Sequence, residues 1–547
     1  MANQRIWGTL DPFFESGAIV GRRVANADFL RHLLEADPFS EYHFFLDAPG
    51  QIRGLKKALK LEASEEARAK CRIFPRSELP GLLGKTSYHC FHQSDCIFLP
   101  HHVAALRNRY SKELFPITGA THSLSYAVYP AAFLHHMWTG TTARDCVVAT
   151  SQTGQGVVQG FYAMLRENYG LDPTRFPAPR VELIPLGVRE DMAPVGPDVR
   201  EALRKEFNVG QDQVMILVFG RLHHASKMDY LAVFRALNRC FQDGLDHGKV
   251  RLAMAGWGDD EEPFLAKVQG LAKAMGLQLS VHLRPNEARK RRLFQAADIF
   301  VSPSDNPQET FGLTLLEAAA SGLPVVASDY DGYKDLVRHG ETGYLIPTVG
   351  PAHTEPIDIM APLQPENRYH LLLAQQTAVE VKGLTQSLAE LIADPGKRTA
   401  MGEAGRDMAR AFAWPRIIDK WVELWERLWQ EPIPNEDGVR QAEHPLTMPF
   451  GRIFGAYPTS TLTPEVILVW SRSGEALYRG QESPIIYQGL EGLVDVEQLK
   501  TLVFLARKPR SVGEMTEQLM EAYPDMGTDK GKFLVNWALK HDFLEQA

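Results

Sequence analysis

The stretch that decides the fold runs from Ala297 to Ala327 and reads ADIFVSPSDNPQETFGLTLLEAAASGLPVVA. It predicts a short β-branched strand, a loop, a helix that begins near Gly312, and a tight turn into a second strand. A glycine where a strand passes into a helix exposes backbone N–H groups at the positive end of the helix dipole. Such a junction is a natural site for a phosphate or diphosphate group.

Two carboxylates lie in this stretch, Glu309 just before the helix and Glu317 inside it. The helical rise between them would be about 12 Å. This separation is too large for the acid and nucleophile of a glycosidase, which lie about 5–10 Å apart. The two carboxylates could instead hold the ends of one long ligand, with its diphosphate between them. The spacing alone leaves another interpretation open, a capping glutamate and an ordinary helix glutamate.

Short apolar runs alternate with longer helical stretches on both sides of this segment. The alternation predicts βαβ units and doubly wound parallel sheets, and two series of strands predict two such domains. The first series is Tyr42–Leu46, Tyr88–Phe91, Ile117–Ala120 and Cys146–Thr150, and the second is Val214–Phe219, Arg251–Ala255, Leu279–Leu283, Ile299–Ser302 and Pro324–Ala327. Helices are predicted at Met228–Gln242, Pro263–Met275 and Arg289–Ala296.

The chain divides into five predicted parts. A helix follows the second domain and carries Trp421, Trp425 and Trp429 along one face, a pattern typical of burial against another domain. Proline-rich, polar sequence then predicts a linker. The parts are a first domain (1–195), a second domain (196–413), the tryptophan helix (414–430), the linker (431–457) and a small, mainly helical, winged-helix-like module (458–547). Within the second domain, Pro347–Glu366 predicts an inserted surface loop.

Composition excludes several classes of function. The 547 residues include 59 Lys plus Arg and 67 Asp plus Glu, a net charge of −8, which argues against a dedicated nucleic-acid binder. The sequence has no run of about 18–20 apolar residues that could span a bilayer, and its start lacks the apolar core of a secretory signal. Five cysteines without a Cys-x-x-Cys pair predict no disulfide framework and a cytoplasmic location.

A second element strengthens the diphosphate interpretation. Arg221 and Lys227 follow the first strand of the second domain, where open α/β sheets bind ligands. Two cations there could neutralise the charge that develops on a diphosphate. Two basic residues six positions apart mean little alone, but beside a helix-dipole site in the same domain they indicate diphosphate binding.

These motifs occur in an order that resembles family 4 of the retaining glycosyltransferases, which have the GT-B fold. In the second half the resemblance is carried by Arg221–Lys227, Ala255–Asp259, Val281–Pro285, Ala297–Ser304 and Glu309–Glu317. The first half agrees more loosely, at Glu15–Gly21 (without the usual Gly-Gly pair), Thr121–Leu124, Thr150–Ser151 and Ile184–Val188. The resemblance implies two Rossmann-like domains that face a cleft, with helix 414–430 crossing back to the first domain.

The resemblance also implies a retaining hexosyltransferase that moves a sugar from a UDP- or GDP-sugar to an acceptor hydroxyl by front-face transfer. The implied catalytic residues are Arg221, Lys227, Glu309 and His122, and the implied donor-binding residues are Gly17, Arg284, Phe311, Gly312, Leu313, Thr314 and Glu317. Glu317 would bind the ribose hydroxyls, and His122 would line the sugar and acceptor side. The resemblance implies no metal and no cofactor other than the donor, because the cations and the helix dipole neutralise the diphosphate.

Two alternatives remain open, a non-catalytic nucleotide-sugar-binding regulatory protein and a nucleotide-sugar epimerase of the same fold. The sequence does not identify the acceptor, and the candidates are a peptide or protein, a glycan, or a lipid-linked glycan. The module at 458–547 is acidic and has apolar helix faces, so we expect it to recognise a peptide, a protein or a partner subunit.

Three further segments carry weaker signals. Tyr88–His102 is rich in histidine and cysteine, but its spacing fits no zinc signature, and strand-end residues lining the cleft are favoured, with His92 touching an acceptor. The basic run Arg289–Arg292 favours a solvated helix face. Ile52–Leu61 is either an ordinary surface helix or a basic patch that faces anionic lipid.

Overall fold

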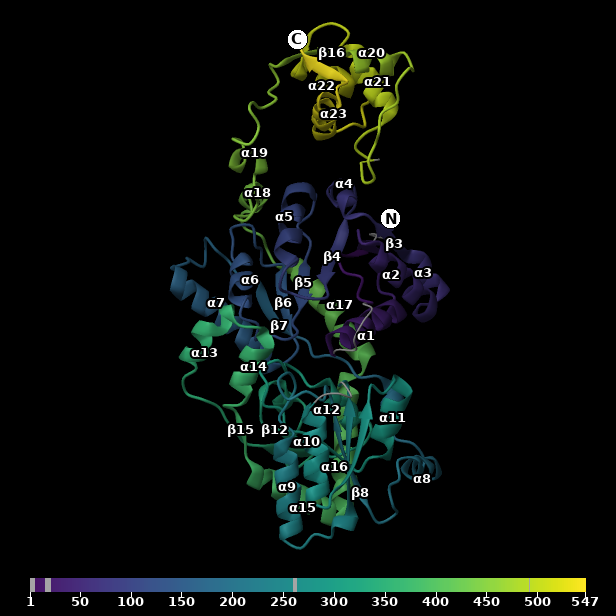
Figure 1. Ribbon diagram of the computed structural model, residues 1–547, viewed down its shortest axis with the longest axis vertical. Helices are drawn as coiled ribbons and strands as arrows, with labels where there is room; N and C mark the ends of the chain where they lie inside the picture. The colour runs from purple at the N-terminus through teal and green to yellow at the C-terminus, as the bar shows by residue number, and fades with distance from the viewer. Residues whose placement is uncertain (1–4, 15–20, 259–262, 491) are drawn as a thin grey trace. The chain divides into compact units, whose positions relative to one another are not determined.

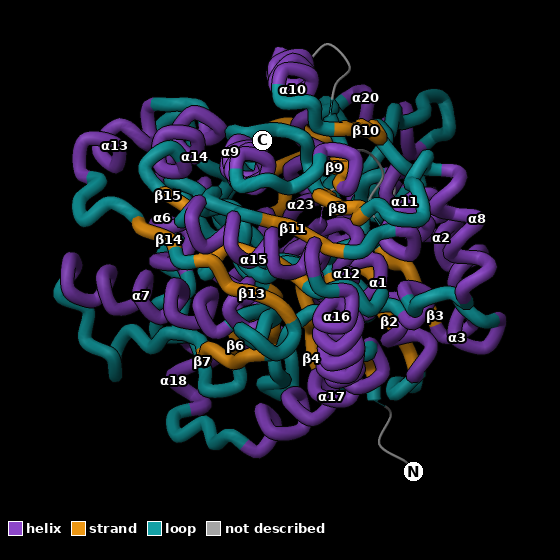
Figure 2. Tube along the Cα trace, turned by 90° about the horizontal axis from the view of Figure 1, so that it is seen from below, coloured by secondary structure: helices purple, strands orange, loops and turns teal. Residues whose placement is uncertain are grey.

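The computed structural model describes residues 5–14, 21–258, 263–490 and 492–547. Contacts within the chain divide it into two compact units, Met1–Leu446 and Thr447–Ala547. The first unit holds two parallel β-sheets whose strands lie between helices (Figures 1 and 2). The fold class is therefore doubly wound α/β, as the alternation of strands and helices predicts.

The first sheet has seven parallel strands in the order β3-β2-β1-β4-β5-β6-β7. The order reverses between β1 and β4, so a crevice opens there at the carboxyl ends of the strands. The strands are β1 (Ile6–Thr9), β2 (Glu41–Phe45), β3 (Cys71–Phe74), β4 (Tyr88–Gln93), β5 (Ile117–Ala120), β6 (Asp145–Ala149) and β7 (Arg180–Leu183). The helices are α1 (Gly21–Ala36), α2 (Pro49–Glu62), α3 (Glu65–Lys70), η1 (Arg76–Glu78), α4 (Leu79–Lys85), α5 (Pro100–Tyr110), α6 (Tyr129–His135) and α7 (Gln152–Tyr169).

The second sheet has six parallel strands in the order β10-β9-β8-β11-β12-β13, with its reversal between β8 and β11. The strands are β8 (Val214–Phe219), β9 (Val250–Gly256), β10 (Gln278–Leu283), β11 (Ile299–Ser302), β12 (Val325–Ser328) and β13 (Gly343–Ile346). The helices before and between them are η2 (Glu190–Met192), α8 (Pro197–Glu206), α9 (Leu231–Gln242), η3 (His247–Lys249), α10 (Pro263–Ala274), α11 (Glu287–Ala296), α12 (Leu313–Ala320) and η4 (Asp331–Asp335). The helices after them are α15 (Val381–Ala393), α16 (Pro395–Ala409) and η6 (Arg410–Phe412).

The central strand β8 shows why this sheet is buried on both faces. Val214, Ile216 and Val218 pack in one apolar cluster with residues of α9, α10 and α15. Met215 and Leu217 point to the other face and pack with residues of α8, α11 and α12. Because side chains alternate along a strand, an uninterrupted apolar run covers both faces at once.

Helix α17 (Trp414–Gln430) returns to the first domain, and in Figure 1 its green ribbon lies among the purple and blue elements of that domain. Trp421 and Trp425 belong to the same buried cluster as residues of α1 and β2. The indole N–H of Trp425 donates to Thr118 Oγ1 at 3.1 Å, and that of Trp429 donates to the His89 carbonyl at 2.6 Å. The tryptophan stripe is thus a contact with the first domain.

In the two parallel sheets, the structure adds four strands that the apolar pattern did not predict, namely β1, β3, β7 and β13. Strands β3 (CRIF) and β7 (RVEL) lie at the two edges of the first sheet and carry charged side chains. Edge strands need not be apolar on both faces, so their sequences lack the uninterrupted run of a central strand.

The segment predicted as an inserted surface loop, Pro347–Glu366, is mostly regular structure, and that prediction is wrong. It belongs to an insertion between β13 and α15, in which a short antiparallel pair of strands closes the base. The insertion comprises β14 (Thr348–Val349), α13 (Glu355–Met360), η5 (Ala361–Leu363), α14 (Glu366–Ala374) and β15 (Ala378–Val379).

The first part of the predicted linker packs on the first domain. Its helix α18 (Glu436–Gln441) contacts α5, and the Arg440 guanidinium donates to the Ser111 carbonyl. His444 is buried and hydrogen bonds through Nε2 to the His135 carbonyl at 3.1 Å. The boundary between the two compact units consequently falls after Leu446.

The second unit is a small module with its own apolar core. Its sheet is antiparallel in the order β17-β16-β18, and buried residues such as Leu468, Leu502 and Leu534 form one cluster. The elements are α19 (Phe450–Ile453), β16 (Ile467–Trp470), α20 (Arg472–Tyr478), α21 (Val496–Leu505), β17 (Arg510–Ser511), α22 (Val512–Ala522), α23 (Thr528–Lys540) and β18 (Leu544–Gln546). This agrees with the predicted mainly helical module.

No helix in the described part of the chain combines the length and the apolar character needed to cross a membrane.

Candidate active site

A cavity of about 500 Å³ lies between the two domains of the first unit. One wall comes from the second domain, at the carboxyl ends of β8 and β9 and at the start of α12. The opposite wall comes from the first domain and includes Thr121, His122 and Ser123 after β5, and Thr150 after β6. Both walls therefore lie where the strands of their sheets end, as expected for ligand sites of open α/β sheets.

Two close approaches of the backbone shape the second-domain wall. Gly312 is the N-cap of α12 with φ +104°, and a Cβ there would lie 2.6 Å from the ring of Tyr333. Gly256 has φ +144°, and a Cβ would lie 1.6 Å from the carbonyl oxygen of Gly220. Glycine is required at both positions, since a side chain would collide and the left-handed region disfavours one. The close approaches bring the backbone of α12 and of β8 to the cavity surface.

The start of α12 is suited to an anion. Gly312 has no side chain to cap the helix, and the backbone of Leu313 and Thr314 lines the cavity. The hydroxyl of Thr314 is buried and has no hydrogen-bond partner among the described residues. Uncapped N–H groups and the positive end of the helix dipole favour a bound phosphate there.

Lys227 and Glu309 form an ion pair in this wall, with side chains 13% and 17% exposed. Tyr333 joins them, because its hydroxyl lies 3.4 Å from Lys227 Nζ and 2.8 Å from Ser302 Oγ. Burial acts to raise the pKa of Glu309, but the Lys227 ammonium, together with the backbone N–H groups of Phe311 and Thr310, outweighs burial and holds that pKa below its usual range. Burial acts to lower the pKa of Lys227, and Glu309 and Tyr333 together raise it. Both groups are therefore charged at neutral pH.

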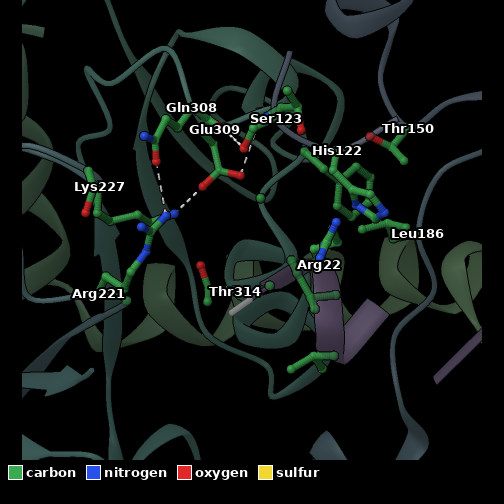
Figure 3. Close-up of a pocket in the computed structure, with 18 of the residues that line it drawn as sticks. Arg22, His122, Ser123, Thr150, Leu186, Arg221, Lys227, Gln308, Glu309 and Thr314 are labelled. Carbon is green, nitrogen blue, oxygen red and sulfur yellow. Dashed lines mark hydrogen bonds and ion pairs between the residues drawn. The ribbon is translucent and has the colours of Figure 1, made fainter. Parts of the chain in front are cut away.

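Arg221 lies beside this pair but contacts a neutral group. Its guanidinium donates to Gln308 Oε1 at 3.3 Å, and Figure 3 shows Arg221 and Lys227 directed toward Gln308 and Glu309. A guanidinium whose acceptor is an amide keeps its full charge available to a ligand.

A second ion pair lies deeper in the same wall, between Glu317 and Lys290. Burial raises the pKa of Glu317, although Lys290 acts in the opposite direction. Lys290 uses one carboxylate oxygen, and Glu317 Oε2 is buried without a partner among the described residues. A buried carboxylate oxygen without a donor loses solvation that nothing in the protein replaces, which indicates a place for a ligand hydroxyl.

The first-domain wall differs in chemistry. His122 lines the cavity (Figure 3). It hydrogen bonds through Nε2 to the Ser94 carbonyl at 2.7 Å. Ser123 Oγ donates to the Gln308 carbonyl at 2.8 Å, and Ser151 Oγ donates to the Thr310 carbonyl at 2.6 Å. Small hydroxyl side chains of the first domain thus reach the backbone of the second-domain wall.

The structure brings most of the predicted residues together at this cavity. The lining includes Arg221, Lys227, Glu309, His122, Phe311, Gly312, Leu313, Thr314 and Glu317. Arg284 lies outside the lining residues, with its guanidinium 5.9 Å from the ring centroid of Trp257, which does line the cavity. Gly17 falls outside the described residues.

Lys290 and Gln308 line the cavity, and Tyr333 contacts Lys227 in its wall, but none of the three was predicted. The solvated-face interpretation of the basic run is wrong for Lys290, whose side chain is 9% exposed, whereas that of Arg292 is 46% exposed. A signal was present, because Lys290 precedes the buried Leu293 and Phe294 by three and four residues and so shares their helix face. The sequence around Tyr333 and Gln308 carried no comparable signal.

His92 does not line the cavity. It is 1% exposed, its Nδ1 hydrogen bonds to Thr118 Oγ1 at 2.9 Å, and burial lowers its pKa to about 3. Its ring packs 4.5 Å from that of Trp421, so the prediction that it touches an acceptor is wrong. Within residues 5–14, 21–258, 263–490 and 492–547, no group of three or more histidine, cysteine or acidic side chains is placed to hold a metal ion.

Comparisons with known proteins agree with this geometry. Residues 199–354 match the family described as "Glycosyl transferases group 1". The D-inositol 3-phosphate glycosyltransferase of Geodermatophilus obscurus is 32% identical over 271 residues, which cover 49% of this chain and 50% of that protein. The chain spans about half the length of the curated relatives it matches.

Two solved structures share the fold. A glycosyltransferase from Rickettsia africae has a TM-score of 0.54 at 16% identity, covering 79% of this chain and 100% of that one. Anabaena Alr3699/HepE in complex with UDP has a TM-score of 0.51 at 15% identity, covering 77% and 100%. Identities this low show the fold alone, the two-domain GT-B fold that the sequence predicts.

Proposed function

We propose that this chain, whose residues 199–354 match the group 1 glycosyl transferases, carries out a metal-independent, retaining transfer of a sugar from a nucleotide-diphosphate sugar to an acceptor hydroxyl. One observation carries the proposal. Arg221, the Lys227–Glu309 pair, Glu317 and the uncapped start of α12 meet in one cavity between the domains. This combination supplies donors for a diphosphate and acceptors for hydroxyl groups.

The donor would lie along the second-domain wall. The N–H groups at the start of α12 and the Thr314 hydroxyl would bind the diphosphate. The unpartnered Oε2 of Glu317 would accept a ribose hydroxyl, and Glu309 would accept a sugar hydroxyl. In this arrangement the two carboxylates hold opposite ends of the donor.

In the transfer step, the bond between the anomeric carbon and the diphosphate oxygen breaks, and the acceptor oxygen bonds to that carbon on the same face. The acceptor proton passes to the leaving diphosphate. Arg221 and Lys227 would stabilise the negative charge on the leaving group, together with the α12 dipole. Because this chain supplies that positive charge itself, the proposal requires no divalent cation.

UDP- and GDP-sugars are the proposed donors, with UDP-sugars tested first because Alr3699/HepE, which has the same fold, was solved with UDP. The cytoplasmic location stays a prediction.

The separate module is proposed to recognise a peptide or protein acceptor, or a partner subunit. Its own buried core supports treating it as an independent unit. Deletion of 458–547 should leave donor hydrolysis within about twofold and raise the acceptor KM by about tenfold or more, by loss of effective concentration. Normal glycosylation of the acceptor by the truncated chain would contradict this role.

The test of the proposed function is a panel of UDP-, GDP- and ADP-sugars. We expect one group of donors to be hydrolysed slowly and to raise the Tm, with activity retained in excess EDTA. No hydrolysis and no stabilisation by any nucleotide sugar or free nucleoside diphosphate would contradict the proposal. Interconversion of sugars without transfer would indicate the epimerase alternative.

A further inference from the structure

The insertion between β13 and α15 reaches across to the first domain. In Figure 1 its green helix α14 lies against blue elements of that domain. Glu366 Oε1 accepts a hydrogen bond from the Ala127 N–H at 3.3 Å. One turn later, His370 Nε2 lies 2.9 Å from Ser125 Oγ and 3.1 Å from the Ser125 carbonyl oxygen. Helix α14 is thus a contact between the domains.

His370 also contacts the candidate active site. Its side chain is fully buried, and its Nδ1 lies 2.6 Å from Nε2 of Gln308. Gln308 is 8% exposed and accepts the hydrogen bond from Arg221 through Oε1. A continuous chain of hydrogen bonds therefore joins Arg221 to Ser125 through Gln308 and His370.

The direction of each bond in this chain follows from Arg221. A guanidinium can only donate, so Gln308 must present its oxygen to Arg221 and its NH₂ group to His370. Nδ1 of His370 must then be the acceptor, which leaves the proton on Nε2 to donate to the Ser125 carbonyl. Each group has one orientation that satisfies its neighbours, and a side chain lacking one of these functions breaks the chain.

The surroundings of His370 favour this neutral ring. Burial lowers its pKa, although the Ser125 carbonyl and Glu366 act in the opposite direction, and Arg221 adds to the lowering. The rings of Tyr126 and Tyr369 each lie 5.5 Å from the imidazole ring and close the space around it.

We propose that His370 is a positioning residue for glycosyl transfer, which holds Gln308 and through it Arg221 in line with the leaving diphosphate. The inference rests on the proposed function. His370 does not line the cavity, so it acts on the reaction through Gln308. Ser123 adds a second contact to the same residue, because its hydroxyl donates to the Gln308 carbonyl. The orientation of Arg221 therefore depends on the contact between the domains.

The test compares His370→Leu with His370→Gln in the full-length chain, using the nucleotide sugar that the wild type hydrolyses. Leucine removes both hydrogen bonds, and we expect kcat to fall about tenfold to a hundredfold, the scale of a misplaced catalytic group. The Kd for the intact nucleotide sugar should change less than about threefold, because the groups assigned to its diphosphate and ribose (the start of α12, Thr314 and Glu317) are untouched, whereas Arg221 acts mainly on the charge that develops as the diphosphate leaves. Glutamine can accept from Gln308 and donate to Ser125, so it should recover a clear part of the lost kcat.

The matched control is His136→Leu. His136 is 2% exposed and uses both ring nitrogens, toward the Tyr162 hydroxyl (2.9 Å) and the Ile97 carbonyl (3.2 Å), but it is not one of the residues that line the cavity. The His136→Leu variant should have a lower Tm than the wild type. Below that temperature its kcat should stay within about twofold of the wild-type value.

Four outcomes overturn the inference. The first is an unchanged kcat in His370→Leu, and the second is an equal loss of kcat in the folded leucine and glutamine variants. The third is a kcat loss in His136→Leu that matches His370→Leu at equal loss of Tm. If His370→Leu does not fold, a kcat of His370→Gln equal to that of Gln308→Leu also overturns it. A wild-type chain that hydrolyses no nucleotide sugar would instead overturn the proposed function on which the inference rests.

Discussion

The two walls of the cavity interact through different kinds of side chain. The second-domain wall holds buried charges in pairs, Lys227 with Glu309 and Lys290 with Glu317. The first-domain wall reaches it with small hydroxyl groups, such as Ser123 and Ser151, that bond to backbone carbonyls. A buried charge is costly to leave unpaired, whereas one neutral hydrogen bond contributes about 1 kcal/mol. The difference indicates a rigid second-domain wall, whose hydrogen bonds to the first domain cost little to break.

Lys227→Ala should produce the largest effect. It removes a donor to the leaving group, so kcat should fall about a hundredfold to a thousandfold. It also leaves Glu309 buried without its partner, which should lower the free energy of unfolding by about 3–5 kcal/mol.

Arg221→Ala is the matched variant for this comparison. It should lower kcat on a similar scale but cost less than about 1 kcal/mol of stability, because its partner Gln308 is neutral. Steady-state kinetics and urea unfolding measure the two effects. Equal losses of the free energy of unfolding in the two variants would show that the Lys227–Glu309 ion pair contributes no more to stability than the Arg221–Gln308 hydrogen bond.

Glu317→Ala should weaken binding of the nucleoside diphosphate about tenfold to a hundredfold, the range for a hydrogen bond to a charged group. It should also destabilise the chain, because Lys290 stays buried alone. The double variant Glu317→Ala with Lys290→Met should regain stability without regaining affinity. Calorimetric titration and thermal unfolding separate the two quantities, and recovery of affinity in the double variant would argue against a direct contact of Glu317 with the ligand.

Asp305 belongs to the second domain but does not line the cavity. Its titration tests whether a buried charge is tolerated there as it is in the second-domain wall. Burial raises its pKa from 3.8 to about 7, and the Asp229 N–H only partly opposes this. The folded state therefore holds a proton that the unfolded state releases. The contribution of protonated Asp305 to the free energy of unfolding is complete below about pH 4 and is lost as pH rises to about 7. Between those values the free energy of unfolding should fall by about 1 kcal/mol per pH unit.

Asp305→Asn keeps an oxygen acceptor for the Asp229 N–H but cannot ionise. It should flatten that part of the stability profile, measured as Tm from pH 4 to 8. A variant profile parallel to that of the wild type would assign the slope to another group.

Ser123→Ala should have the smallest effect. It removes one hydrogen bond to the Gln308 carbonyl, so kcat/KM should fall about twofold to tenfold with little change in Tm. Ser87→Ala, an exposed position that bonds to Glu113, serves as the control and should match the wild type. If Ser123→Ala lowers kcat/KM more than Glu317→Ala does, the contrast between the two walls is reversed.

Sequence alone determined the elements whose signal is local. Strand β8 was predicted with its observed bounds, Val214–Phe219, because an uninterrupted apolar run requires burial on both faces. The Glu309–Gly312–Glu317 segment was predicted as a phosphate or diphosphate site because the strand-to-helix junction that exposes its N–H groups lies within a few residues.

Only the tertiary structure decided which distant groups meet. Lys290 lies in a basic run that favours solvent, and it becomes buried only because α11 packs beside α12, where Glu317 supplies the opposite charge. The Gln308–His370 and Ser125–His370 contacts join residues 62 and 245 positions apart. No local pattern encodes such a contact, because a hydrogen bond between distant residues depends on the packing of whole domains, and the helical insertion between β13 and α15 carried no periodicity that would have placed α14 against the first domain.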